Sequence, residues 1–221
     1  MLSQLRLNQL LSPVLPVGAY SYSQGLEWAV HAGWVVNSDH LSVWLDELIE
    51  GPLAQQELPL LKNLYEAFLN KDSDRINYWS QRVVAFRDTA ELRAEERARA
   101  DAYLRVVDGL PYAIDPSFRN SMEKTPLATL AWSCVQWDIE LRALLSAFAY
   151  NWLDAYVVNG VKIIPLGQSE GQYLLHTKLP LINNAVDTAL NIADNAIGFS
   201  VPSVSMASCL HESQYSRIYR S

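Results

Sequence analysis

The chain has 221 residues, 50% of them hydrophobic, and its 24 acidic and 17 basic side chains give a formal net charge of −7. A chain of this length can bury one substantial core, so we expect a single domain over residues 1–221. The negative charge opposes attraction to phosphate backbones and argues against nucleic acid as a partner. No apolar run reaches the roughly 18 residues of a membrane span, and residues 1–11 lack the pattern of a secretory signal. We therefore expect a cytoplasmic protein with no membrane partner.

The chain offers few side chains for metal or redox chemistry. Cys134 and Cys209 are too few for a disulfide framework and are not spaced as metal ligands, so we expect reduced thiols and no metal site. His211 stands beside Glu212, but sequence neighbours point to different helix faces, so a closed metal site would need distant residues. A weak, transient nickel contact at His211 is the alternative, because imidazole suits nickel. The four histidines are isolated from one another: His31, His40, His176 and His211.

Residues 11–27, here called the signature loop, read L-S-P-V-L-P-V-G-A-Y-S-Y-S-Q-G-L-E. Pro13 and Pro16 fix the backbone φ angle and lack an N–H donor. Gly18 permits backbone conformations that are closed to residues with a Cβ atom. So much local geometry predicts a rigid loop with a defined surface.

The end of the signature loop predicts a helix start. Ser21 and Gln24 have the spacing of a capping box, and the apolar periodicity predicts a helix over residues 22–32. We expect Tyr20 and Tyr22 to be presented in a fixed pose at this start. The alternative is a loop that only joins two helices, with both tyrosines half buried.

Helical periodicity also governs residues 37–86. Residues 37–39 offer N-cap side chains for one helix, and residues 72–74 offer them for a later helix. Gly51 and Pro52 are expected to end the first helix, and the next one is expected to kink at Pro59. The apolar stripe of the first helix comprises Leu41, Trp44, Leu45, Leu48 and Ile49.

Residues 87–105 combine five arginines with five acidic side chains. Glu95 with Arg99 and Asp101 with Arg105 have favourable i,i+4 spacing, which predicts a solvated helix with one packed edge. Small residues recur every four positions along that edge and permit close approach of another helix, from this chain or from a second subunit. These residues are Ala90, Ala94, Ala98 and Ala102.

Residues 109–124 show the weakest periodicity and are expected to form loops and short turns. Thr125 then predicts a capped helix that begins at Pro126, because proline is favoured at the first helical position. The longest apolar stripe of the chain follows within residues 141–156, and we expect this helix at the centre of the bundle.

Helical periodicity is expected to recur up to Gly198 and to be lost after it. Residues 157–167 are expected to continue the preceding helix and then turn, because the sequence offers no partner strand. Ser169 and Gln172 repeat the capping-box spacing, and Pro180 is expected to begin the last helix. The predicted fold class is thus all-α, a single-domain bundle of roughly ten helices.

A polar and aromatic tail, residues 199–221, follows the last predicted helix. Tyr215, Arg217, Tyr219 and Arg220 alternate flat rings with guanidinium groups, the side chains that dominate interface hot spots. A segment this short and polar cannot bury a core, so it gains order against a partner or by folding back on its own bundle.

Lys162 is a further candidate for partner contact. It lies between two β-branched apolar residues, so its charge either extends to water or meets an acidic group.

The sequence contains no recognisable catalytic motif. Phosphate-binding loops, dinucleotide-binding glycine patterns, zinc-protease helices and nucleophile elbows are all missing, which favours an interaction protein over an enzyme. The rival hypothesis is a small-molecule enzyme of the thiaminase-like type, with Cys134 near Tyr150 or Tyr156 and Glu140. Cys134 lies on an apolar stripe, which favours a buried, unreactive thiol.

Four stretches of the chain carry a family resemblance. The signature loop resembles S-P-x-L-P-x-G-x-[FY]-[ST]-[YF]-S-x-G-L-E, the pattern that opens members of the UreF family of urease accessory proteins. T-A-E-L-R-A-E at residues 89–95, V-K-I-I-P-L-G-Q at 161–168 and H-E-S-Q-Y-S-R-I-Y-R-S at 211–221 agree in the same order. Together these stretches span nearly the whole chain.

The resemblance implies an all-helical, homodimeric chaperone for nickel insertion into urease. Family members bind the accessory protein UreD, called UreH in some organisms, and recruit the GTPase UreG, which delivers nickel to apo-urease. No resident cofactor is expected on this basis, with nickel at most a transient passenger, and the tail is expected to order when UreD binds. The resemblance and the residue types together give the expected partner-binding residues as Tyr20, Tyr22, Glu27, Lys162, Gln168, Tyr215, Arg217, Tyr219 and Arg220.

Overall fold

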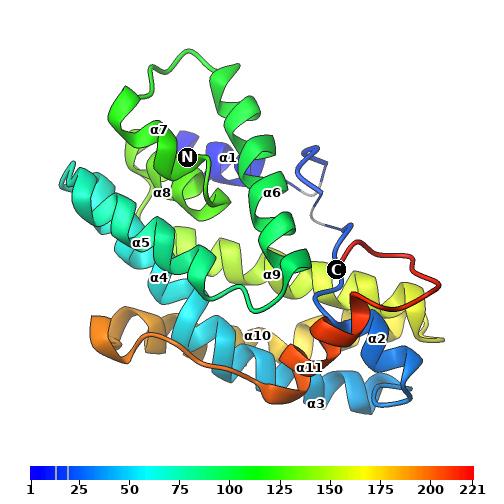
Figure 1. Ribbon diagram of the computed structural model, residues 1–221. Helices are drawn as coiled ribbons and strands as arrows, with labels where there is room; N and C mark the ends of the chain where they lie inside the picture. The colour runs from blue at the N-terminus through cyan, green and yellow to red at the C-terminus, as the bar shows by residue number, and fades with distance from the viewer. Residues whose placement is uncertain (13, 19) are drawn as a thin grey trace.

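The computed structural model describes residues 1–12, 14–18 and 20–221, and all regular secondary structure in these ranges is helical. The predicted all-α class is therefore confirmed (Figure 1). Within the same ranges, no helix is both long and apolar enough to cross a membrane. In chain order the elements are α1 (Leu2–Leu10), α2 (Leu26–His31), α3 (Ser38–Leu48), the π-helical segment η1 (Ile49–Glu57), α4 (Leu58–Leu69), α5 (Ser73–Ala85), α6 (Ala90–Asp108), α7 (Pro116–Met122), α8 (Pro126–Gln136), α9 (Leu141–Ile163), α10 (Gln168–Asn191), the 3-10 turn η2 (Asp194–Ala196) and α11 (Pro202–His211).

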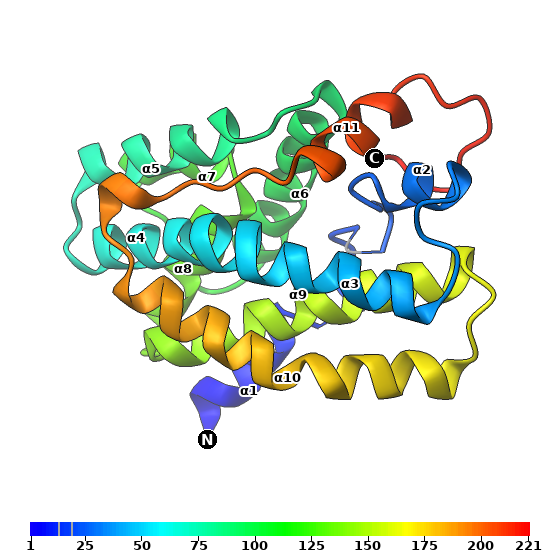
Figure 2. The same ribbon diagram turned by 90° about the horizontal axis from the view of Figure 1, so that it is seen from below.

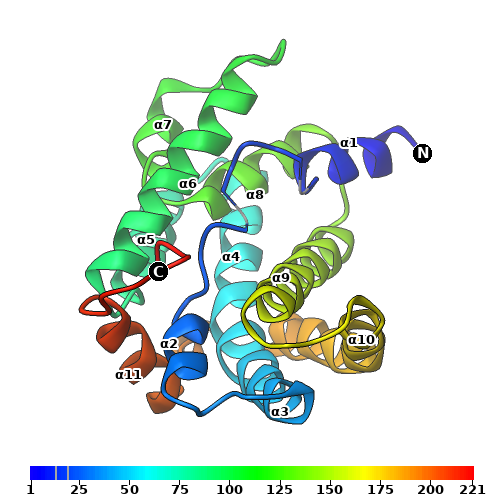
Figure 3. The same ribbon diagram turned by 90° about the vertical axis from the view of Figure 1, so that its right-hand side faces the viewer.

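Helix α4 occupies the centre of the bundle. It packs against α5, α8, α9 and α10, and nine of its 12 residues are buried. We expected this place for residues 141–156, which lie in α9. That helix keeps an exposed face along Arg142, Ser146 and Tyr150 and pairs with α10 beside α4 (Figure 3). The longest apolar stripe therefore does not mark the central helix, because α4 is shorter but buried on most of its surface.

Three predicted helix starts are confirmed by N-cap hydrogen bonds. The Asn37 side chain accepts the N–H three residues further on at 2.9 Å, and Asp72 does the same at 3.0 Å. The Thr125 hydroxyl accepts the N–H two residues further on at 3.1 Å. Each bond satisfies an N–H group that helix geometry leaves without a partner.

The chain runs without a break from α3 through η1 into α4, so the predicted helix end at Gly51 and Pro52 is wrong. The wider turns of a π-helix accommodate Pro52, which has no N–H and would clash inside a regular α-helix. Pro59 lies in the first turn of α4, and the irregularity that we expected at Pro59 lies upstream, in η1.

Two short helices, α7 and α11, lie in segments that we expected to be irregular. Helix α7 falls in the predicted loop 109–124, where Asp115 caps it by accepting the Ser117 N–H at 2.9 Å. Helix α11 falls inside the predicted tail. Both have proline in their first turn, a start signal that acts locally even where apolar periodicity is weak.

Helix α10 is longer than predicted. It begins at Gln168 without a side-chain cap, so Ser169 and Gln172 do not form a capping box, and it continues through Pro180 instead of starting there. It packs along α9, α3, η1 and α4, and Figure 2 shows it running along one side of the bundle. These contacts hold the helix on both sides of the proline.

Candidate functional site

The C-terminal segment, residues 212–221 after α11, lies against the signature loop (Figures 1 and 3). The Arg220 N–H donates to the Ser21 carbonyl at 2.9 Å, and the Ser23 N–H donates to the main-chain oxygen of Ser221 at 2.6 Å. The Ser23 hydroxyl donates to the same oxygen, also at 2.6 Å. Of the two arrangements expected for the tail, the structure shows the one folded back on its own bundle.

The turn before α2 differs from the predicted capping box. Gln24 has a φ of 52° and Gly25 a φ of 89°, so α2 is shorter than the predicted helix 22–32. The Ser23 hydroxyl takes the capping role and accepts the Glu27 N–H at 3.2 Å. Glycine is needed at position 25 because a Cβ atom there would lie 2.9 Å from a backbone nitrogen of α11.

Glu27 receives the C-terminal segment. Its side chain is buried, and its two carboxylate oxygens accept the N–H groups of Ile218 at 2.6 Å and Tyr219 at 2.9 Å. We expected Glu27 on a partner-facing surface. The structure places it inside, with both oxygens occupied by contacts within this chain.

His211 is fully buried between two carboxylates. Its Nε2 lies 3.1 Å from Glu27 and its Nδ1 lies 2.7 Å from Glu91, which also pairs with Arg217. No sequence pattern indicated this cluster, because the two carboxylates are 184 and 120 residues away from His211 along the chain. In the described ranges, no group of three or more His, Cys, Asp or Glu side chains is arranged to hold a metal ion.

Tyr20 and Lys162 meet at the edge of the same region. The Tyr20 hydroxyl donates to Asp154 at 3.1 Å, and burial together with that carboxylate raises the pKa of Tyr20 to about 12. Lys162 is exposed, with Nζ 5.4 Å from the centre of the Tyr20 ring. Its charge therefore extends to water over an aromatic face. Pro13, to which we assigned part of the rigidity of this loop, lies outside the described residues.

Asn159 of α9 ties the signature loop to the C-terminal segment. Its side-chain amide donates to the Tyr22 carbonyl at 2.8 Å, and its main-chain carbonyl accepts the Tyr219 hydroxyl at 3.4 Å. Tyr219 is buried, and burial raises its pKa to about 12, with Glu27 adding to the shift. Tyr219 is therefore an anchor of the segment rather than part of its outer face.

The outer face of the C-terminal segment carries exposed side chains. Tyr215 is fully exposed, Ile218 is 74% exposed, and Arg220 is also exposed. Gln168 is exposed at the start of α10 and makes none of the contacts described above. The structure thus brings the other expected partner-binding residues into one region, which we call the loop–segment surface, and leaves Gln168 apart.

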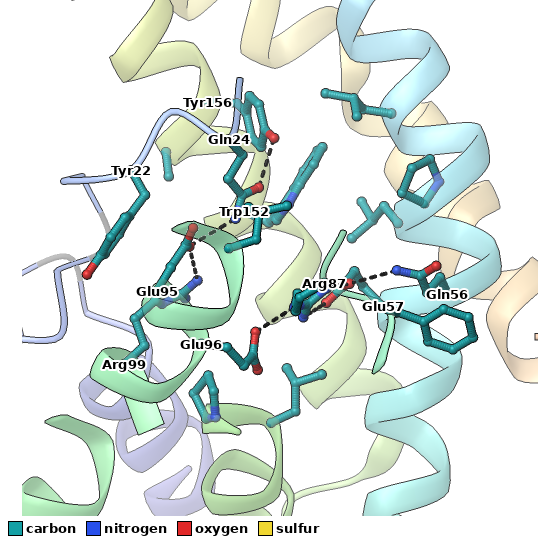
Figure 4. A pocket seen from close by; sticks show the side chains of 18 of the residues that line it. Tyr22, Gln24, Gln56, Glu57, Arg87, Glu95, Glu96, Arg99, Trp152 and Tyr156 are labelled. Carbon is teal, nitrogen blue, oxygen red and sulfur yellow. Dashed lines mark hydrogen bonds and ion pairs between the residues drawn. The ribbon is translucent and has the colours of Figure 1, made fainter. Parts of the chain in front are cut away.

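A cavity of about 470 Å³ lies beside this surface and is lined by parts of η1, α6, α9 and the signature loop (Figure 4). Arg87 donates through Nε to Glu96 at 2.7 Å and through Nη2 to Glu57 at 2.9 Å. Burial raises the pKa of Glu57, but the Arg87 guanidinium outweighs it, so that the pKa of Glu57 lies below its ordinary value. We call Glu57, Arg87 and Glu96 the buried triad.

Glu95 links the cavity to the C-terminal segment. It accepts hydrogen bonds from Gln24 at 3.0 Å, from Arg99 at 3.2 Å and from the Ser221 hydroxyl at 3.0 Å. Gln24 in turn accepts the Tyr156 hydroxyl at 2.8 Å. Burial raises the pKa of Glu95 even though Arg99 acts in the opposite direction.

The solvated helix expected over residues 87–105 is wrong on its inner face, where Glu95 and Glu96 are buried. The predicted Glu95–Arg99 pair is confirmed. A signal was present, because Glu96 shares one helical face with apolar residues, and a carboxylate facing a core needs a partner. Those residues are Ala100, Tyr103 and Val107. Of the two alternatives for the alanine edge, packing within this chain applies only to Ala102, which is buried, whereas Ala90, Ala94 and Ala98 are exposed.

Cys134, the nucleophile of the rival enzyme hypothesis, is fully buried on α8. Burial raises the pKa of its thiol to about 12, so the reactive thiolate is scarce near neutral pH. Tyr156 lines the cavity described above and is bonded to Gln24, whereas Tyr150 is 43% exposed on α9. This structure therefore gives Cys134 no support as a nucleophile.

Fold and site define an all-helical protein in which the signature loop and the C-terminal segment build one surface beside the buried triad. The sequence model of the UreF family matches residues 35–177, more than half of the chain. The chain therefore belongs to the UreF family.

Relatives match the chain almost end to end, including the signature loop and the C-terminal segment. A protein of Alcanivorax borkumensis named urease accessory protein UreF is 42% identical over 98% of this chain and 97% of its own length. A protein of the same name from Pseudomonas putida is 43% identical over 100% and 98%. One from Escherichia coli O157:H7 is 39% identical over 99% and 97%.

Proposed function

We propose that this protein is a urease accessory protein that acts as a non-catalytic scaffold during assembly of the nickel metallocentre. The observation that carries this proposal is the near-complete match to relatives named urease accessory protein UreF, at 42% and 43% identity. The absence of catalytic motifs in the sequence and the burial of Cys134 are consistent with a role in binding rather than catalysis.

The proposed partners are UreD (UreH), the GTPase UreG and apo-urease, with the loop–segment surface as the contact region for UreD. Exposed Tyr215, Ile218 and Arg220 are of the types that gather at interfaces, and Tyr219 and Glu27 hold them in place from inside. A surface already fixed within the chain loses less conformational entropy on binding. A homodimer is part of the proposal, and the exposed alanine edge of α6 permits close approach of a helix from a second copy.

The proposed mechanism is coupling by differential binding. Contacts on two faces of the scaffold hold UreG in its nickel-loaded form, so that GTP hydrolysis is productive only when apo-urease is present. Nickel is the cargo of this assembly and only a transient passenger of this chain. The scaffold positions UreG and determines when GTP hydrolysis is productive, and UreG itself hydrolyses GTP.

The proposal is tested by co-expressing the chain with UreD and UreG, and separately by omitting it during nickel-dependent activation of urease. We expect a ternary complex that elutes together and a urease that stays inactive without this chain. Urease that activates fully without it would overturn the function.

The role of the loop–segment surface is tested with Arg217→Ala/Arg220→Ala and with Tyr215→Ala, which removes a fully exposed side chain. Arg142→Ala is the matched control, because Arg142 pairs with Asp187 on the exposed side of α9 and α10. We expect reduced UreD co-purification and urease activation in the first two variants and no change in the control. If UreD co-purification and urease activation stayed unchanged in both variants, this surface would not be the UreD interface.

A further inference from the structure

The contacts of His211 call for one proton more than a neutral imidazole between two ionised carboxylates holds. A neutral imidazole has one donor and one acceptor nitrogen, and an ionised carboxylate only accepts. Both ring nitrogens of His211 lie within hydrogen-bond distance of a carboxylate oxygen, at 2.7 and 3.1 Å. Both contacts are hydrogen bonds only when the ring is doubly protonated or when one carboxyl group carries the proton.

Because the cluster is buried, the absence of this proton would be strongly unfavourable. The His211 side chain is fully buried, so water cannot separate a nitrogen lone pair from a facing carboxylate. Without the proton, two acceptors would oppose each other at one of these contacts, and the negative charges of Glu27 and Glu91 would lose their shared counter-charge. Unpaired charges and acceptors in a buried site are strongly unfavourable.

The same two carboxylates hold the C-terminal segment. Glu27 accepts the main-chain N–H groups of Ile218 and Tyr219, and Glu91 pairs with Arg217. A change in the position or charge of either carboxylate is therefore transmitted directly to the segment. The His211 main-chain carbonyl accepts the Gln214 N–H at 3.0 Å, and its side chain acts on the segment through these two carboxylates.

The other titratable and charged groups near the cluster belong to the C-terminal segment. Glu212, next to His211, accepts the N–H groups of Ala90 and Glu91 at 2.8 and 3.2 Å and so caps α6. Arg217 supplies the only positive side chain among the described residues that pair with these carboxylates, apart from His211. Tyr219 donates its main-chain N–H to Glu27 and its hydroxyl to the main-chain carbonyl of Asn159. Burial raises the pKa of this hydroxyl to about 12, so it stays neutral across the physiological range.

We propose that His211 is a protonation-dependent latch that holds the C-terminal segment against the signature loop. The docked form requires the extra proton and the released form does not, so raising the pH through the titration of this cluster favours release. This inference concerns the chain alone and does not depend on UreD or urease.

The latch is tested by hydrogen exchange of residues 213–221 between pH 6 and 9, corrected for intrinsic exchange rates, in the wild type, in His211→Gln and in His176→Gln. His176 is exposed on α10 and serves as the control. In the wild type we expect protection to fall by roughly tenfold per pH unit once the cluster loses its single proton. In His211→Gln we expect weaker protection that is insensitive to pH, and His176→Gln should follow the wild type.

A second measurement keeps the proposal testable if His211→Gln fails to fold. Histidine 15N chemical shifts of the wild-type protein report on the hydrogen bonding and protonation of both ring nitrogens. We expect them to change at the same pH at which protection of residues 213–221 is lost. Wild-type protection that is flat across this pH range, or segment release that does not coincide with the change in the His211 signals, would overturn the latch.

Discussion

Replacing Arg87 by Met tests the reasoning on the buried triad. The guanidinium lies between Glu57 and Glu96, all three side chains are at most 14% exposed, and the Thr125 hydroxyl also donates to Glu96. Removing the positive partner of a buried ion pair leaves uncompensated charge and typically costs about 3–5 kcal/mol. Global stability of a domain is about 5–15 kcal/mol, so the variant should lose a large share of it. Urea denaturation followed by circular dichroism gives the free energy of unfolding at pH 7.

The pH dependence gives the sharper test of the triad. With Arg87 present, the pKa of Glu57 is lowered in the folded protein. Glu57 therefore adds to the free energy of unfolding above its pKa in the unfolded chain, and this contribution is lost as the pH falls through its pKa in the folded protein. In Arg87→Met, the guanidinium no longer outweighs the burial of Glu57, so the pKa of this carboxyl group rises and its protonation stabilises the folded variant as the pH falls. The stability difference between the two proteins should therefore shrink between about pH 7 and pH 5.

The control for the triad is Arg142→Met, whose exposed pair with Asp187 should contribute less than about 1 kcal/mol. A loss below about 1 kcal/mol in Arg87→Met at pH 7, the level of an exposed pair, would refute the argument. So would a difference from the wild type that stays constant on acidification.

Three further predictions follow from single contacts. Gly51→Ala should lower the free energy of unfolding by about 1–3 kcal/mol in a thermal or urea melt, because the added Cβ atom would lie 2.5 Å from Phe199 Cε1. An unchanged melting temperature would show that the Phe199 ring moves away freely. A thiol reagent should modify exposed Cys209 quickly and buried Cys134 only at the rate of unfolding, and two equally fast thiols would revive a reactive Cys134. Glu27→Gln should lower protection of the C-terminal segment, at a cost of about 1–3 kcal/mol, and hydrogen exchange like that of the wild type would contradict its role as receptor.

The sequence predicted those parts of the fold that depend on neighbours in the chain. The caps at Asn37, Asp72 and Thr125 are interactions between a side chain and an N–H two or three residues away, and all three are confirmed. The errors at Pro52 and Pro180 both come from the local tendency of proline to end a helix, which the structure overrides. A π-helical turn accommodates Pro52, and packing from neighbouring elements holds the helix at Pro180.

The candidate site was predictable in its residues but not in its geometry. Residue types and motifs singled out Tyr20, Glu27 and Tyr219, yet nothing in the sequence indicated that Glu27 would bind the backbone on which Tyr219 lies. The buried triad was missed because its members come from η1, the loop before α6, and α6, which are separated in the sequence. Interactions over such separations depend on the tertiary fold.

The residues of the loop–segment surface therefore divide by what they contact. Glu27, Ser23 and Tyr219 are occupied inside the chain and fix the position of the C-terminal segment, whereas Tyr215 and Arg220 face outward. A substitution of the first kind changes partner binding only by moving the segment, so its effect should appear equally in hydrogen exchange of the isolated chain. A substitution of the second kind should leave that exchange unchanged and weaken the complex. Measuring both quantities for each variant separates a residue that supports the surface from one that touches a partner.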